Sequence, residues 1–321
     1  MGLLMRLVFF ALINLLLVFA GFPVIRKKKL LLGWAMFVIS ILAVYLLFQY
    51  QSPVIKMLAI IATTFTGMKI IVVPMEYRNK PVKLNFKQWA AFAGGWVGMR
   101  AQPFETLGDG PLLGAGQMIR FGISRLAFGG LVVLAAREIV LLPFNTTLIH
   151  VVVSVLLLAG FSLILHFGLL SISAGMWRHS GANTYLLFRQ PAKATSLAEF
   201  WGKRWNMAFS EMTSIAIFRP LRSKAGPAAA LMFAFIFSGI LHELALSLPV
   251  NHGYGLPTLY FVIQGGLVLL EKALKDKRGN FLQNKLLAHA WVFFWVVAPA
   301  PLLFHAEFIK QIVWPMAGLK L

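Results

Sequence analysis

The segment Ser238-Gly-Ile-Leu-His-Glu-Leu244 places one histidine, His242, inside an apolar run that is long enough to cross a membrane. A charged side chain at that depth costs about 2.5–3.5 kcal/mol on insertion scales, so an ionisable residue there indicates a functional role. A second segment, Phe200-Trp-Gly-Lys-Arg-Trp-Asn206, is aromatic and basic, as segments at a membrane surface are. We expect Asn206 and His242 to converge on one site.

The composition predicts an all-α, polytopic transmembrane helical bundle. Of the 321 residues 59% are hydrophobic, whereas soluble domains average about 45–50% apolar residues. Apolar runs of roughly 17–25 residues indicate about eight spans. These lie near 4–25, 30–49, 53–74, 122–143, 147–176, 227–249, 255–273 and 286–304. The first run shows no small-residue cleavage site, so we expect no cleavable signal peptide.

The charge distribution predicts the orientation of the chain in the membrane. Lys and Arg number 30 against 10 Asp and Glu, a net charge of +20. Regions 26–29, 75–125, 177–226 and 272–285 hold 24 of these basic residues, and with eight spans all four regions fall on one face. The positive-inside rule makes that face cytoplasmic, and both termini then lie opposite. This rule accounts for the charge without a nucleic-acid partner. A bacterial inner membrane and the endoplasmic reticulum both fit.

Several kinds of chemistry have no support in the sequence. The chain has no cysteine, which excludes disulfides and a cysteine nucleophile. It has no P-loop, dinucleotide-binding glycine fingerprint or Gly-x-Ser-x-Gly elbow. None of its seven histidines has the spacing of a helical metal site, so we expect no metal.

Residues 196–211 read as one amphipathic helix at the membrane surface. Ser196 as N-cap with Glu199 three residues later is a capping box. Beyond it Trp201, Trp205 and Phe209 recur at intervals of four and would share one face. Membrane anchoring alone would explain such a helix.

His242 lies 15 residues after Pro227, or about 22 Å along an ideal helix. Ser238 is four residues earlier on the same helical face, where it could form a hydrogen bond with the ring. A packed, hydrogen-bonded structural histidine is the alternative that these residues leave open.

Three stretches together resemble a known family. Ser196-Leu-Ala-Glu-Phe-Trp-Gly-Lys-Arg-Trp-Asn206, Phe218-Arg-Pro220 and Ser238–Leu244 are similar to the wax synthase domain of the membrane-bound O-acyltransferase superfamily. The strong match covers about 196–245, and the resemblance implies a single integral-membrane acyltransferase domain over 1–321. It also implies that His242 is catalytic and that Asn206 is the second polar site residue.

The resemblance implies an acyl transfer in which neutral His242 acts as general base on an alcohol. The alcohol oxygen attacks the thioester carbonyl of acyl-CoA as cosubstrate, and the Asn206 amide stabilises the oxyanion. We assign substrate binding to Trp201, Trp205, Lys203, Arg204, Ser238 and Arg219, with the basic members attracting the CoA phosphates. No metal or redox cofactor is expected. The partners are the lipid bilayer, acyl-CoA and a lipid acceptor, in the first place a long-chain alcohol that gives a wax ester.

Two alternatives remain open from the sequence. A sterol, a diacylglycerol or a cell-surface polyol or glycan could accept the acyl group through the same two residues. A transporter or non-catalytic scaffold could instead use His242 as a proton relay. Against the transporter, the two halves show no repeated pair of broken helices.

Overall fold

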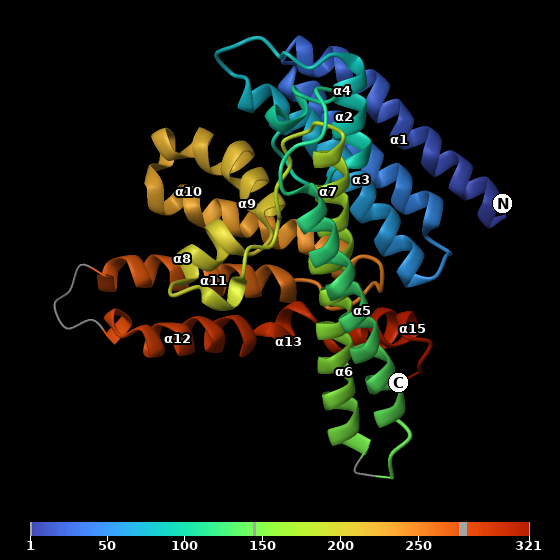
Figure 1. Ribbon diagram of the computed structural model, residues 1–321, viewed down its shortest axis with the longest axis vertical. Coiled ribbons are helices and arrows are strands. Elements are labelled where there is room, and N and C mark those ends of the chain that lie inside the picture. The colour runs from blue at the N-terminus through green and yellow to red at the C-terminus, as the bar shows by residue number, and fades with distance from the viewer. Residues whose placement is uncertain (1, 144–145, 276–280, 321) are drawn as a thin grey trace. The chain divides into compact units, whose positions relative to one another are not determined.

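The computed structural model describes residues 2–143, 146–275 and 281–320. Within these ranges every regular element is a helix, which confirms the all-α expectation (Figure 1). The chain divides into two compact units. Unit 1 holds the chain up to Gln102 and Arg189–Phe304, and unit 2 holds Pro103–Phe188 and the chain from His305 onward. The expectation of one domain over 1–321 stays a prediction.

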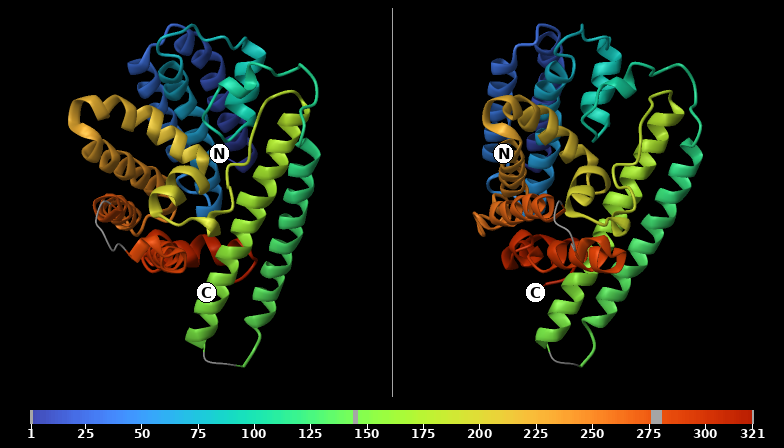
Figure 2. Two further views of the ribbon diagram at one scale, coloured as in Figure 1. Left: turned by 60° about the vertical axis from the view of Figure 1, so that its left-hand side comes forward. Right: turned by 90° about the vertical axis from the view of Figure 1, so that its left-hand side faces the viewer.

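Unit 1 begins with three long helices that pack side by side (Figures 1 and 2). They are α1 (Leu3–Arg26), α2 (Leu30–Phe48) and α3 (Pro53–Glu76), and a shorter helix, α4 (Phe86–Gly95), contacts α1 and α3. Pro53 occupies the first turn of α3, where its missing N–H costs no helical hydrogen bond. Most of α3 is buried, while α1 and α2 expose much of their apolar surface, as helices facing lipid do.

The second half of unit 1 is a series of short and long helices that alternate with π-helical turns (η4, η5 and η6) and 3₁₀ turns (η3 and η7). It contains η3 (Pro191–Lys193), α8 (Leu197–Glu199), η4 (Phe200–Arg204), α9 (Met207–Thr213), η5 (Ser214–Phe218), α10 (Arg219–His242), η6 (Glu243–Ser247), α11 (Leu256–Lys275), η7 (Phe281–Gln283), α12 (Lys285–Val297) and α13 (Ala300–Leu303). Gly226 has φ 80° and divides α10, so its long straight part begins at Pro227, where the sequence predicted a span.

Seven helices or runs of joined helices are long and apolar enough to cross a membrane within the described residues. They are Leu3–Arg26, Leu30–Phe48, Pro53–Glu76, Ala115–Ile139, Thr146–His179, Met207–Ser247 and Lys285–Leu303. They match seven of the expected spans, which confirms a polytopic bundle. The span expected at 255–273 forms α11 but is not among the seven, since Gln264, Glu271 and Lys272 lower its apolar content. The placement of both termini opposite the basic face stays a prediction.

Unit 2 is built on two long helical rods. The first is α5 (Ala115–Ile139), and the second joins α6 (Thr146–Ser162), η2 (Leu163–Leu169) and α7 (Leu170–His179), as the long span at 147–176 predicted. Glycines allow the two backbones to approach closely: a Cβ on Gly122 would lie 2.7 Å from the Gly168 carbonyl oxygen, and one on Gly129 would lie 2.8 Å from that of Gly160. The remaining elements are η1 (Gln102–Phe104), α14 (Ala306–Phe308), η8 (Ile309–Val313) and α15 (Trp314–Met316).

Lys69 is a buried ionisable residue of unit 1 that the sequence analysis did not single out. It lies in α3 and is 1% exposed. Its Nζ donates hydrogen bonds to the carbonyl oxygens of Phe92 (2.7 Å), Ala93 (3.0 Å) and Trp96. These carbonyls lie at the C-terminal end of α4, where helices have acceptors without intrahelical partners. An ammonium group has three donors, so Lys69 satisfies three acceptors at once.

We expect Lys69→Met to lower the free energy of unfolding by about 3 kcal/mol, because three buried carbonyls lose their donor. The measurement is thermal unfolding of the purified protein in detergent. Lys56→Met is the matched control, since Lys56 lies on the same helix and is less buried. Equal melting temperatures for the two variants would contradict the capping role.

Candidate functional site

The expected single helix over 196–211 is wrong, because the chain reverses at Trp205 and Asn206. α8 and η4 end at Arg204, Trp205 is extended (φ −101°, ψ 125°), and Asn206 is left-handed (φ 44°, ψ 68°). A new helix, α9, starts at Met207 and belongs to a run of joined helices that continues to Ser247. Asparagine is among the few residues besides glycine that adopt the left-handed conformation readily. Trp201, Trp205 and Phe209 therefore do not share one helix face.

The predicted start of this region is confirmed in part. The Glu199 backbone N–H donates to the Ser196 hydroxyl (3.0 Å), as an N-cap requires. The Glu199 carboxylate, however, accepts from the Thr195 backbone N–H (2.9 Å) rather than from that of Ser196. Its other oxygen pairs with Arg204 Nε at 2.7 Å. The bond from Thr195 and the Arg204 guanidinium hold the pKa of Glu199 below its usual value.

The aromatic segment is fixed by polar side chains of α11. The Glu271 carboxylate accepts from the backbone N–H groups of Leu197 (2.8 Å) and Ala198 (3.2 Å), at the N-terminus of α8. The Gln264 side-chain oxygen accepts from the indole N–H of Trp201 at 3.0 Å. Gln264 and Glu271 are both buried and lie seven residues apart, so one face of α11 makes these contacts. α11 thereby sets the position of Trp201.

His242 is held by its own helix. Its Nδ1 donates to the Ser238 backbone carbonyl oxygen at 2.7 Å, since a carbonyl can only accept. The predicted hydrogen bond between Ser238 and the ring is therefore present, and its acceptor is the backbone oxygen of Ser238. With Nδ1 carrying the proton, the neutral ring has its lone pair on Nε2. The rings of Phe209 and Phe261 lie against the imidazole, with centroids 4.8 and 4.4 Å away.

Glu243, next to His242, joins this helix to α11. Its Oε1 accepts from the backbone N–H of Gly255 (3.0 Å) and from both the backbone N–H (3.0 Å) and the hydroxyl (2.9 Å) of Thr258. These bonds fix the start of α11, and Phe261 one turn later packs on the His242 ring. Glu243 is therefore a positioning residue for His242.

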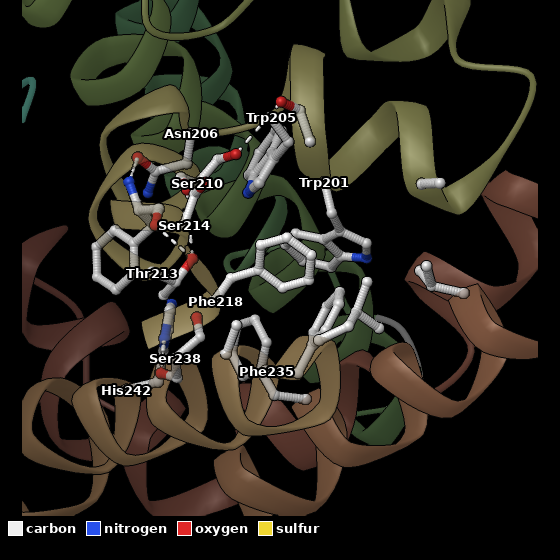
Figure 3. A pocket seen from close by; sticks show the side chains of 17 residues that line it. Trp201, Trp205, Asn206, Ser210, Thr213, Ser214, Phe218, Phe235, Ser238 and His242 are labelled. Carbon is white, nitrogen blue, oxygen red and sulfur yellow. Dashed lines mark hydrogen bonds between the residues drawn. The ribbon is translucent and has the colours of Figure 1, made fainter. Parts of the chain in front are cut away.

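A pocket of about 230 Å³ lies among these elements (Figure 3). Five of the predicted site residues line it: Trp201, Trp205, Asn206, Ser238 and His242. Lys203, Arg204 and Arg219 do not line it. The structure thus brings the two principal residues to one pocket, while the roles assigned to all eight stay predictions.

Asn206 has one end of its amide occupied and the other available. Its Oδ1 accepts from the Phe209 backbone N–H at 3.4 Å and so caps α9. Its Nδ2 is then the end of the amide that can donate to a ligand. In Figure 3 Asn206 and His242 lie at two ends of a polar wall, with Ser210, Ser214 and Thr213 between them.

The hydroxyls of this wall are pocket residues that the sequence analysis missed. Asn206, Ser210, Thr213 and Ser214 are spaced at i, i+4, i+7 and i+8, which is the pattern of one helical face. That spacing is visible in the sequence and could have found them. The rest of the lining is mainly apolar; this part, which we call the apolar wall, includes Phe218, Leu231, Ala234, Phe235 and Val268.

Comparison with known proteins bears on the same segment. Residues 185–263 match the membrane bound O-acyl transferase family, and this range contains every pocket residue except Val268. The resemblance seen over 196–245 is thereby confirmed.

Curated relatives are similar over larger stretches. The probable long-chain-alcohol O-fatty-acyltransferase 6 of Arabidopsis thaliana is 29% identical over 161 residues, which cover 41% of this chain and 46% of the relative. The long-chain-alcohol O-fatty-acyltransferase of Simmondsia chinensis is 32% identical over 109 residues, which cover 32% of this chain and 31% of the relative. The acyl-CoA–sterol O-acyltransferase 1 of Arabidopsis thaliana is 30% identical over 130 residues, or 38% of each. The chain spans less than half the length of these relatives.

We expect Asn206→Ala to lower the free energy of unfolding by about 1–2 kcal/mol, because alanine is strained in the left-handed conformation. Asn206→Gly keeps that conformation and should cost only a few tenths of a kcal/mol for the lost cap. Thermal unfolding of both variants checks this. Asn251 is also left-handed, with φ 55°, and lies outside the pocket, so Asn251→Ala and Asn251→Gly should show the same difference. Equal stability of the two Asn206 variants would contradict the conformational argument.

Proposed function

We propose that this chain is an integral-membrane O-acyltransferase that transfers a fatty acyl group from acyl-CoA to the hydroxyl of a lipid alcohol. A long-chain fatty alcohol, giving a wax ester, is the preferred acceptor. The observation that carries the proposal is the geometry at His242. Its Nδ1 is bound to a backbone carbonyl, which leaves Nε2 as proton acceptor in a pocket that the Asn206 amide also lines.

The reaction divides between these two residues. Nε2 of His242 removes the proton from the alcohol as its oxygen attacks the thioester carbonyl carbon. The new C–O bond gives a tetrahedral intermediate, whose negative oxygen accepts a hydrogen bond from Asn206 Nδ2. The intermediate collapses by breaking the C–S bond. The CoA sulfur leaves with the proton held by His242, which returns the ring to its neutral form.

The apolar wall supplies the binding energy for the chains. Phe218, Leu231, Phe235 and Val268 would contact the methylene groups of an acyl chain or a fatty alcohol. Burial of such a chain contributes about 0.8 kcal/mol per CH₂. The steps above use a proton acceptor and a hydrogen-bond donor, so we propose that no metal or redox cofactor takes part.

The basic residues outside the pocket would act on the CoA phosphates. Lys203 and Arg219 are exposed, which suits electrostatic attraction of an anionic cosubstrate. Arg204 is engaged by Glu199 and by the carbonyl oxygens of Arg189 and Gln190 at 3.3 Å each. We therefore assign to Arg204 the positioning of the aromatic segment rather than phosphate binding. With these assignments we propose that the basic face is the cytoplasmic one.

A sterol is the second candidate acceptor. One relative is named as an acyl-CoA–sterol O-acyltransferase and is as similar to this chain as the long-chain-alcohol enzymes are. The proposed chemistry is the same for both acceptors, since each presents one hydroxyl on an apolar body. Hexadecanol and a sterol should therefore be offered separately.

We expect His242→Ala to reduce the turnover of palmitoyl-CoA with hexadecanol by a factor of about 10²–10⁴, the contribution of a general base. The measurement is CoA release by purified protein in detergent, with the ester identified by mass. His289→Ala is the matched control, because His289 Nδ1 donates to the Lys285 carbonyl oxygen (2.6 Å) in the same way but lies outside the pocket. Equal activity of His242→Ala and wild type would remove His242 from the mechanism. Failure of wild type with every acceptor would favour a transporter or scaffold.

For Asn206→Gly we expect kcat to fall by a factor of about 10²–10³ with little change in the KM for palmitoyl-CoA, because the lost amide acts on the developing oxyanion. Steady-state kinetics separates this from a binding defect. An increase in KM at constant kcat would instead assign Asn206 to substrate binding.

A further inference from the structure

A second, larger cavity lies in unit 1, apart from the proposed active site. It is a groove of about 570 Å³ between α1 and α2, and it shares no residue with the pocket at His242. The α1 side includes Ile13, Leu16, Ala20 and Val24, and the α2 side includes Leu32, Met36, Ile39 and Ala43. We call it the α1–α2 groove.

The groove has an apolar body and a basic end. Lys27 and Lys29 line it where α1 and α2 are joined, and both are exposed. Its other polar lining residue is Ser40, whose hydroxyl donates to the Phe37 carbonyl oxygen at 2.9 Å. The body of the groove therefore suits an apolar ligand group. The charged residues of the groove lie at one end.

The neighbouring basic residues of this turn have other contacts. Lys28 is left-handed (φ 50°), and its Nζ donates to the carbonyl oxygens of Arg78 (3.2 Å) and Lys80 (2.9 Å). The Arg26 guanidinium lies over the Phe22 ring, 5.3 Å from its centroid. The turn thus directs Lys28 to another loop, while Lys27 and Lys29 stay at the groove.

The length of the groove matches one leaflet of a bilayer. From Ile13 to Val24 the α1 lining covers eleven residue steps, or roughly 16 Å at 1.5 Å per residue. The hydrocarbon core of a bilayer is about 30 Å thick, so this distance is about half of it. An acyl chain lying in the groove would reach from the basic turn to near the midplane.

We propose that the α1–α2 groove binds an anionic phospholipid of the leaflet that faces the basic turn. The phosphate lies between Lys27 and Lys29, and one acyl chain lies along the groove. Exposed apolar side chains such as Leu16 (66% exposed) and Ile39 (65% exposed) leave the groove open sideways to lipid. Basic residues next to a membrane surface attract anionic headgroups. Lys27 and Lys29 therefore favour an anionic phospholipid over a zwitterionic one. This site does not depend on the proposed acyl transfer.

The test is native mass spectrometry of the full chain in detergent, titrated with dioleoyl phosphatidylglycerol or dioleoyl phosphatidylcholine. Wild type should bind one phosphatidylglycerol in preference to phosphatidylcholine. Lys27→Ala/Lys29→Ala should weaken phosphatidylglycerol binding about tenfold or more and leave phosphatidylcholine binding unchanged. Lys83→Ala/Lys87→Ala is the matched control, since both lysines are exposed and lie outside the groove.

A second variant tests the apolar part. Ala20→Leu/Ala43→Leu fills the groove without changing its charge and should weaken binding of both lipids. Melting temperatures of all variants should stay near that of wild type, because these residues are at or near the surface. Equal phosphatidylglycerol binding by wild type and both groove variants would overturn the proposal. Displacement of the lipid by an equal concentration of palmitoyl-CoA would also overturn it, by assigning the groove to the acyl donor.

Discussion

Backbone polar groups in a membrane need partners within the protein, and this constraint organises the structure. The helices of unit 1 are interrupted repeatedly, and each interruption leaves backbone N–H or C=O groups without an intrahelical partner. Buried or half-buried side chains bind these groups: Glu271 binds the start of α8, Glu243 binds the start of α11, and Lys69 binds the end of α4. Each of these contacts joins segments distant in the sequence, so satisfying the backbone also fixes the tertiary arrangement.

The proposed site makes use of the same contacts. His242 and Asn206 each use one polar side-chain atom in a hydrogen bond to the backbone. The other polar atom of each side chain remains available to a ligand. The first bond sets the tautomer of the ring and the second sets the direction of the amide. Because these orientations exist before any substrate arrives, little reorganisation is left for the reaction itself. α11 supports His242 by packing Phe261 on the imidazole, and it also holds Trp201 at the pocket.

Much of this could be predicted from the sequence, and the failures share a physical cause. Apolar length located the spans, and the cost of a histidine in an apolar run identified His242. The prediction of one continuous helix failed at Trp205 and Asn206. The left-handed conformation of Asn206 breaks the helix there, although the aromatic residues keep a helical spacing across the break. It also could not reveal that Gln264 and Glu271 of α11 contact Trp201 and the start of α8. Those are contacts between elements, which spacing along one helix does not encode.

The bond between His242 and Ser238 has a consequence for the residue at position 238. Its acceptor is a backbone oxygen, so exchanging the side chain at position 238 leaves the bond in place. That side chain also lines the pocket. Under the proposed function, a substitution that the packing around this buried side chain tolerates would reshape the space for the second substrate and keep the bond that orients the ring. Under the proposed function, the choice of acceptor would therefore change through position 238 while the proposed proton acceptor keeps its orientation.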